Sequence, residues 1–337
     1  MQSGKKEKQA MLEFFTNYPI GHYLRSMGRD PNPPKIGLYM SRDATMMMVR
    51  NRKGITFWNG SLKELTGAPG IDITEEQKEK SPHAGLQTPY RREVATRLKL
   101  NNLNELHLIL EDSESYTSSY TVTSFENAED LAAALERDPS SIISSWKNYT
   151  HNNEYLWEIL SPAMEILRGP VRLPKKVILC GFPAERAEAT AKWAESQNQV
   201  LTNIIPATAA ILKWAAEKGP QDGFFILIST TTEIATAYFQ KGELRLFTGQ
   251  RTKEGFTADE ISDLNELAEE TGKGRESTVW CWGILPGSVH HTRLASRYKN
   301  LVSITPEVLR EMSPLPLEET DVRIHEKEAW LLEEALR

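Results

Sequence analysis

Two short polar segments of this 337-residue chain carry residue types that could bind a charged ligand. Each segment directly follows an apolar stretch, as a turn follows a strand. Side-chain hydroxyl groups and the backbone N–H groups of such turns bind anions such as phosphate. The two segments could therefore bind one anion between them, provided that the fold brings them together. The candidate residues are Ser41, Arg42, Asp43 and Thr45 in the first segment and Ser229, Thr230, Thr231 and Thr232 in the second.

Other groupings of reactive residue types do not predict a site. His290 and His291 are neighbours in sequence, so their side chains point in different directions, and we interpret both as surface residues. The run Gly272–Ser277 has the composition of a phosphate-binding loop, but it follows a predicted helix instead of a strand. Cys180 and Cys281 stand far apart. The sequence therefore predicts neither a metal site nor a disulfide, and it favours a reducing compartment.

Charge and hydropathy argue against two classes of function. The net charge is -6 and the isoelectric point is about 5.8. Nucleic acid is not an expected partner, because binding to its phosphates needs a concentrated basic surface. No run approaches the roughly 20 apolar residues that a membrane helix requires. We therefore expect a cytoplasmic protein, which can still dock onto a membrane complex.

The most informative pattern is an internal repeat. Ile36–Gly54 and Phe224–Gly242 align without a gap, 188 residues apart, which places Ser41 on Ser229. Each copy has the pattern of an apolar strand, a polar turn, a second strand and a Lys-Gly turn. We therefore expect two halves built on one plan. The third strands of the two copies are Ile55–Trp58 and Leu244–Phe247.

Strands and helices alternate between the two copies. Val177–Cys180 and Val200–Ile205 are apolar strand patterns. Pro206 then opens a helix over Ala207–Lys218, because proline is tolerated at a helix start. This alternation implies a parallel or mixed sheet with helices on its faces. A closing helix is expected at Glu326–Leu336.

The middle of the chain predicts a small inserted α/β subdomain. Leu106–Leu110 and Tyr120–Phe125 favour two strands that pair with each other. Asn127 is expected to cap a helix that reaches Arg137. A further helix is predicted over Glu154–Leu167.

With these elements in place, the chain resembles the actin/Hsp70/sugar-kinase superfamily. Asn203–Trp214 and the hairpin Phe224–Gly242 are similar to its central helix and second phosphate loop, and Ile36–Trp58 is similar to its first phosphate loop. The resemblance covers residues 35–300. It implies an α/β, actin-like (ribonuclease H-like) fold of two duplicated domains with a small inserted α/β subdomain.

Within that superfamily, the chain is most similar to the type IV pilus assembly protein M (PilM) family. Three features carry this narrower resemblance: the insertion, the short second half, and a terminal helix that ends in Ala-Leu-Arg at Arg337. The expected divisions are an N-terminal arm at 1–34, a first half at 35–170 with the insertion at about 100–140, a second half at 171–306, and a C-terminal tail and helix at 307–337.

The chain departs from the active members of the superfamily at both phosphate loops. There, each hairpin begins with Asp-x-Gly, whose aspartate organises Mg²⁺-bound water and whose glycine lets phosphate approach the backbone. Here Tyr39 and Ser41 stand at these places in the first hairpin, and Leu227 and Ser229 in the second. The adenosine loop is reduced to Gly283-Ile-Leu-Pro-Gly287. We therefore expect a degenerate nucleotide site without ATP, Mg²⁺ or hydrolysis, and hence no enzyme.

The pilus-family resemblance implies a scaffold at the cytoplasmic face of the inner membrane. Members of that family bind a short N-terminal peptide of a membrane-anchored partner, the pilus protein N, and connect it to the pilus motor ATPase. Their groove involves the inserted subdomain, which places it here at Leu106–Phe125, with Tyr116 and Tyr120 as candidate contacts. Both tyrosines are equally typical of ordinary strand or turn packing. The sequence leaves a homo-oligomer open.

Two alternatives stay open from the sequence alone. One is an active ATP-binding member, such as a carbohydrate or acyl kinase. Calorimetry that shows no binding of ATP or ADP would exclude this alternative. The other is the cytoplasmic part of a type II secretion L-like protein. That alternative leads us to expect a membrane helix after the second domain, and none precedes Arg337.

Overall fold

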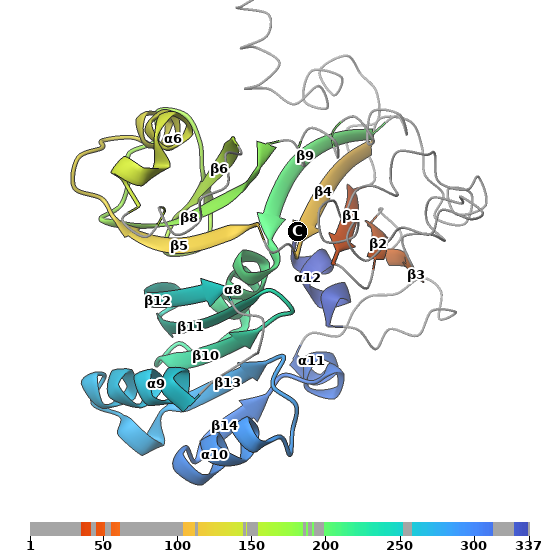
Figure 1. Cartoon of the computed structure of the whole chain (residues 1–337). Helices are drawn as coiled ribbons and strands as arrows, with labels where there is room; N and C mark the ends of the chain where they lie inside the picture. The colour runs from red at the N-terminus through yellow and green to blue at the C-terminus, as the bar shows by residue number, and fades with distance from the viewer. Residues whose placement is uncertain are drawn as a thin grey trace, which may run out of the picture.

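Three β-sheets organise the chain in the computed structural model (Figure 1). Two sheets have five strands each, and the third has four. The third sheet lies at the upper left of the view, the first at the upper right and the second below them. The predicted N-terminal arm at 1–34 lies outside the described residues, which are 35–41, 45–50, 55–60, 104–111, 114–143, 146, 154–184, 187, 191, 199–251, 258–312 and 327–335.

The first sheet begins with an antiparallel hairpin and continues with parallel strands. Its order is β3-β2-β1-β4-β9, with β4 parallel to β1 and β9 parallel to β4. Its central strands read as apolar runs because side chains cover both faces, as in Ile36, Leu38 and Tyr39, all buried. Its strands are β1 (Lys35–Met40), β2 (Thr45–Arg50), β3 (Ile55–Gly60), β4 (Asn104–Leu110) and β9 (Gln199–Pro206).

The second sheet repeats this plan, so the predicted duplication is confirmed. Its order is β12-β11-β10-β13-β14, again an antiparallel hairpin followed by two parallel strands. The Lys-Gly turn of its hairpin has the left-handed backbone that the sequence favours, with φ of 56° at Lys241 and 73° at Gly242. Its strands are β10 (Phe224–Ser229), β11 (Glu233–Gln240), β12 (Glu243–Arg251), β13 (Thr278–Trp282) and β14 (Asn300–Ser303).

The third sheet corrects the predicted pairing of strands in the middle of the chain. The actual partners of Leu106–Leu110 are β1 and β9, on either side of β4 in the first sheet. The next strand along the chain begins earlier than predicted, at Tyr116, and pairs antiparallel with β8. The sheet order is β5-β8-β6-β7, formed by β5 (Tyr116–Thr121), β6 (Tyr155–Leu160), β7 (Ile166–Leu167) and β8 (Lys176–Pro183).

The helix predicted over Glu154–Leu167 is wrong, because this stretch forms β6 and β7. The period-two signal is visible in β6, where Tyr155, Trp157 and Ile159 are buried and Leu156 between them is 40% exposed. The helix expected after Asn127 is confirmed as α6 (Ala128–Arg137). The Asn127 side chain accepts a hydrogen bond from the Asp130 N–H at 2.8 Å. A short 3-10 turn, η2 (Pro139–Ser141), follows it.

Consecutive strands β8 and β9 lie in different sheets, which corrects the parallel sheet expected for Val177–Cys180 and Val200–Ile205. The first pairs antiparallel with β5 and β6, and the second pairs with β4. The third sheet therefore extends beyond the insertion predicted at about 100–140. The predicted second half at 171–306 includes both strands, but they complete the third and first sheets respectively.

Helix α8 (Ala207–Lys218) lies between the first and second sheets and contacts strands of both. Its central residue Trp214 is 1% exposed and packs on Trp280 and Trp282, with ring centroids 5.4 and 5.5 Å away. Helix α12 (Glu328–Ala335) packs on α8, β1 and β2. The remaining helices are α9 (Ala258–Glu270), η4 (Gly274–Glu276), α10 (Val289–Arg297) and α11 (Pro306–Met312).

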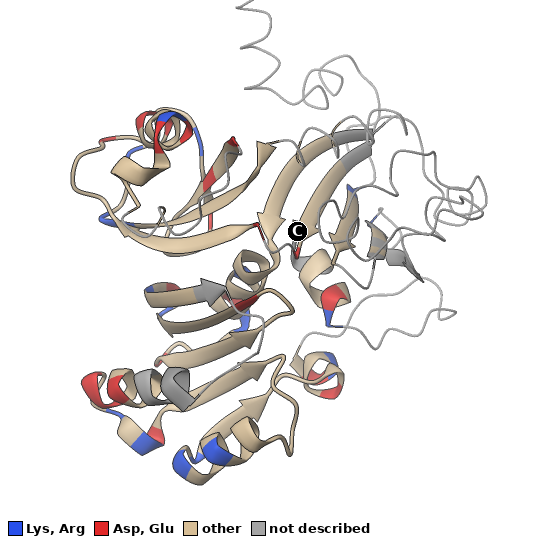
Figure 2. Ribbon diagram, in the orientation of Figure 1, with Lys and Arg blue, Asp and Glu red and all other residues tan. Residues whose placement is uncertain are grey.

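Charged residues gather on the helices of the second half and leave its strands largely uncharged (Figure 2). Acidic residues mark the end of α9, whereas basic residues mark α10. Among the described residues, no helix has the length and hydrophobicity needed to cross a lipid bilayer.

One buried titratable group in the first sheet predicts acid sensitivity. Burial lowers the pKa of His107 in β4 from 6.5 to about 4, and the charges of Lys35, Lys213 and Arg168 also contribute to lowering it. The folded protein therefore keeps this imidazole neutral, whereas the unfolded chain takes up a proton below pH 6.5. We expect stability to fall as the pH drops from 6.5 towards 4, and to fall less in His107→Gln. Urea unfolding midpoints across this range measure the difference, and parallel curves for the two proteins would contradict it.

Candidate functional site

A cleft of about 360 Å³ opens where the first and second sheets meet. The carboxyl ends of β1 and β4 form one wall, and the turn after β10 and the end of β13 form the other. The first residues of α11 and α12 close it. The lining residues are Tyr39, Glu111, Ser229, Thr230, Thr231, Trp282, Gly283, Pro306, Lys327 and Glu328.

Glu111 bridges the two walls of this cleft. It directly follows β4, is 9% exposed, and its N–H donates to the Met40 carbonyl at 2.8 Å. One carboxylate oxygen, Oε2, accepts the Tyr39 hydroxyl at 2.5 Å. The other, Oε1, accepts both the backbone N–H of Thr231 at 2.5 Å and its hydroxyl at 2.8 Å. The two hairpins of the internal repeat are thus joined through one side chain.

The phenol of Tyr39 is a fixed hydrogen-bond donor. Tyr39 is 4% exposed, and burial raises its pKa well above 10.0, with the negative charges of Glu111 and Glu328 raising it further. The hydroxyl therefore stays protonated at neutral pH and donates a hydrogen bond to the Glu111 carboxylate. A charge-assisted bond of this kind is roughly twice as strong as a bond between neutral groups.

Hydrogen bonds within the turn after β10 fix its conformation at the wall of the cleft. Thr230 N–H donates to the Glu233 carbonyl at 2.9 Å, and the Thr230 hydroxyl accepts the N–H groups of Glu233 and Thr232 at 3.0 and 3.3 Å. The Glu233 carboxylate accepts the hydroxyl of Thr208, in α8, at 2.5 Å. These contacts fix the turn so that the N–H of Thr231 points at Glu111.

Leu227 does not belong to the cleft. It is fully buried on the opposite face of the second sheet, in a cluster with residues of α9 and α10 such as Leu264 and Leu294. Side chains alternate along a strand, so its neighbour Ile228 faces the inner core, the same apolar cluster that contains Tyr39. In the two hairpins, Tyr39 pairs with Met46 and Ile228 pairs with Ala235, each one step before the last pair, so Ile228 takes the place of Tyr39. This corrects by one residue the alignment of Tyr39 with Leu227, and neither Tyr39 nor Ile228 is a carboxylate.

Gly283 brings β13 against the turn after β10. Its φ is +78°, and a Cβ atom built on it would lie 1.8 Å from the Ser229 carbonyl oxygen. Only glycine fits this contact. Gly287 also has a positive φ of 81°, but a Cβ atom there would have no neighbour within 4 Å among the described residues, and Gly287 does not line the cleft. Lys327 covers the other side, with its Nζ 5.4 Å from the Trp282 ring centroid.

The remaining predicted loop positions fall in three groups. Ser41 follows β1 directly and does not line the cleft, and Thr45 is the first residue of β2. Thr232 lies in the turn, where its N–H donates to the Thr230 hydroxyl at 3.3 Å. Arg42 and Asp43 lie outside the described residues. In the described part of the chain, no three His, Cys, Asp or Glu side chains come together as a metal site.

The two tyrosines proposed as partner contacts are packed into the third sheet. Tyr116 is 3% exposed, and its ring meets those of Trp146 and Trp157 edge-on, with centroids 5.4 and 6.0 Å away. Tyr120 is half-buried against the same apolar cluster. Leu106–Leu110 is largely buried in the first sheet, so this part of the predicted groove is core.

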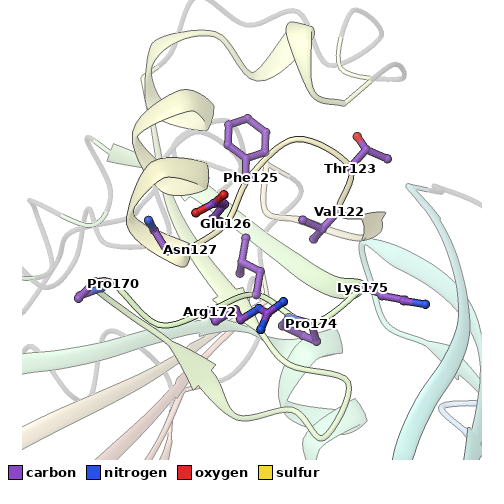
Figure 3. Close-up of a pocket in the computed structure, with 10 residues that line it drawn as sticks. Val122, Thr123, Phe125, Glu126, Asn127, Pro170, Arg172, Pro174 and Lys175 are labelled. Atoms are coloured by element: carbon purple, nitrogen blue, oxygen red, sulfur yellow. The ribbon is translucent and has the colours of Figure 1, made fainter.

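The end of the predicted groove segment does line a hollow, of about 590 Å³, at the edge of the third sheet (Figure 3). Val122 and Phe125 come from the segment after β5, and Arg172 and Lys175 come from the segment before β8. The two segments are joined at both ends of the hollow. There the N–H of Val122 donates to the Lys175 carbonyl, and the N–H of Leu173 donates to the Glu126 carbonyl.

Sequence reasoning missed Glu111, Lys327 and Glu328. The available signal for Glu111 was its place directly after an apolar strand, the position where site residues of α/β folds gather. Its partner Thr231 is 120 positions away, so only the fold identifies the contact. Lys327 and Glu328 enter the cleft because α12 packs back onto β1.

Solved structures share this architecture at low sequence identity. A Bacteroides thetaiotaomicron protein with an actin-like ATPase fold and unknown function matches at a TM-score of 0.51 and 10% identity, over 80% of this chain and 90% of its own. A PilM–PilN type IV pilus biogenesis complex matches at 0.50 and 10%, over 89% and 94%. No family model and no curated protein matches the sequence. The two duplicated sheets and these likenesses together establish that the protein has the actin-like ATPase fold.

Proposed function

We propose that this protein is a non-catalytic scaffold of a type IV pilus assembly complex, at the cytoplasmic face of the inner membrane. The observation that carries the non-catalytic part is the contact of Glu111 with Thr231 and Tyr39. The turn N–H that could receive a phosphate is already donated to the protein's own carboxylate. The inner hairpin positions, Tyr39 and Ile228, supply no charge for Mg²⁺. ATP and Mg²⁺ are therefore not cofactors in this proposal.

The pilus part of the proposal rests on the likeness to the PilM–PilN complex together with the sequence resemblance. The partner proposed is the N-terminal peptide of a membrane-anchored pilus assembly protein, and a link to the pilus motor ATPase would follow from it. A scaffold of this kind needs a fixed surface on which a short segment can lie.

The hollow at the edge of the third sheet is the surface that we assign to this peptide. One wall offers the half-buried side chains of Val122 and Phe125, which also pack on the apolar cluster of the third sheet, and the other offers the exposed cations Arg172 and Lys175. The walls are fixed at both ends by backbone hydrogen bonds, so binding orders little of the protein itself. A segment with an apolar side chain beside an acidic one matches these walls.

Replacing Phe125 with alanine is expected to weaken capture of the peptide about tenfold, because an aromatic side chain in a pocket commonly contributes more than about 1 kcal/mol to binding. The bait is the full chain, and the prey is the inner-membrane pilus assembly protein, identified by mass spectrometry and then titrated as its N-terminal peptide. The matched control is Val289→Ala on α10, since Val289 is apolar and 65% exposed but distant from the hollow in the fold.

Three outcomes decide between the parts of this proposal. Equal capture by the wild type and Phe125→Ala would place the peptide elsewhere and remove the assigned surface. Recovery of a type II secretion component in place of a pilus protein would overturn the pilus assignment and keep the scaffold. Recovery of small-molecule enzymes alone would overturn both. Thermal denaturation of each variant shows that it is folded.

A further inference from the structure

We propose that the turn after β10 is an oxyanion site, and that its permanent occupant is the carboxylate of Glu111. This site is separate from the peptide surface and does not depend on which partner the protein binds. It rests on the geometry of three groups in the cleft: the Thr231 N–H, the Thr231 hydroxyl and the Glu111 carboxylate.

The donors converge as they would on an anion from solution. The N–H and the hydroxyl of Thr231 reach the same oxygen, at 2.5 and 2.8 Å, and the turn that presents them is fixed by Thr230 and Glu233. Backbone N–H groups presented in this way by a turn form anion-binding concavities. The turn would therefore have the same donors to offer to a phosphate or sulfate oxygen.

The burial of Glu111 explains why the donors have to be there. A carboxyl group that is 9% exposed needs hydrogen bonds to replace its lost hydration. Two come from Thr231 in the second half and one from Tyr39 in the first. The Glu111 carboxylate therefore links the two walls of the cleft as a bound phosphate would. Unlike a phosphate, it is part of the chain and does not exchange with solvent. A free oxyanion and the Glu111 carboxylate exclude each other, because they need the same donors.

A simpler alternative is that Glu111 is only a structural tie between the halves. Both views predict that its removal lowers stability. Only an oxyanion site predicts that its removal creates affinity for phosphate. Glu328 is the control residue, because it is another acidic residue that lines the same cleft. The two Thr231 donors bind Glu111, so only the removal of Glu111 releases them.

The test is calorimetric titration of Glu111→Ala with inorganic phosphate at constant ionic strength. We expect it to bind phosphate at least about tenfold more tightly than the wild type, because phosphate would gain the two Thr231 donors that the carboxylate occupies in the wild type. Glu328→Ala should bind no more tightly than the wild type. Adding Thr231→Val to Glu111→Ala should weaken the new affinity. A parallel titration with ATP distinguishes a site for free phosphate from one that takes the phosphate chain of a nucleotide.

Equal phosphate affinity in Glu111→Ala and the wild type would overturn the proposal. So would tight binding by Glu328→Ala, because a general loss of negative charge would then explain the effect. If Glu111→Ala does not fold in chloride buffer, phosphate should restore folding, and Glu111→Ser serves as the second variant. Failure of phosphate to restore either variant also contradicts the proposal. Peptide capture by Phe125→Ala is measured separately, so the assigned peptide surface and the oxyanion site fail independently.

Discussion

Alanine at Gly283 is expected to lower the free energy of unfolding by about 3–5 kcal/mol, combining a close backbone clash with a left-handed backbone. A Cβ atom there would lie 1.8 Å from the Ser229 carbonyl oxygen, and φ is +78°. The backbone can relieve this contact only if the end of β13 moves away from the turn after β10. The cleft wall that carries Thr231 would move with it.

The matched control is Gly287→Ala, in the same loop. Gly287 has nearly the same φ, +81°, but no described atom lies within 4 Å of the place that its Cβ would take. Gly287→Ala should therefore lower the free energy of unfolding only by the strain of a left-handed backbone, about 1 kcal/mol. Urea unfolding midpoints of the two variants give the comparison. Equal losses would mean that β13 does not press on Ser229.

Trp214→Ala, which removes the indole, is expected to lower the free energy of unfolding by about 3–5 kcal/mol. The side chain is 1% exposed and stands on α8 between the two halves, against Trp280 and Trp282. Its deletion leaves a cavity at the junction of the sheets, where the surrounding rings are too rigid to fill it.

The control for that variant is Trp214→Phe, which keeps an aromatic ring in the same place. Among the described residues, the indole N–H of Trp214 has no hydrogen-bond partner. Phenylalanine therefore removes an unsatisfied buried donor while it loses some packing, and the two effects partly cancel. Denaturation monitored by circular dichroism measures both variants. A Trp214→Phe protein as unstable as Trp214→Ala would show that ring packing is not the main contribution.

Local patterns predicted the duplicated halves because each half begins with elements that the sequence specifies on its own. The Lys241-Gly242 turn, the proline before α8 and the Asn127 cap act over a few residues, and all three lie where the sequence placed them. The alternating burial of β6 was equally local. Its Leu and Glu residues also suit a helix, and that composition led to the wrong assignment for Glu154–Leu167.

Sheet membership and the cleft depend on distant pairings that no local pattern contains. Whether β8 and β9 share a sheet is decided by which strands they meet, and those strands lie far away along the chain. The choice between Leu227 and Ile228 depends on which face of β10 meets the first half, a difference of one residue. The contact of Glu111 with Thr231 could not be found from the sequence for the same reason, since the two residues are 120 positions apart.

Helix α12 packs on β1 and β2, so elements from opposite ends of the described chain share one core. Its buried side chains, Trp330 and Leu332 among them, belong to the same apolar cluster as Ile36. During translation, the amino-terminal strands leave the ribosome long before this helix is made. The apolar face that α12 covers therefore stays exposed on the first sheet until α12 itself has been made.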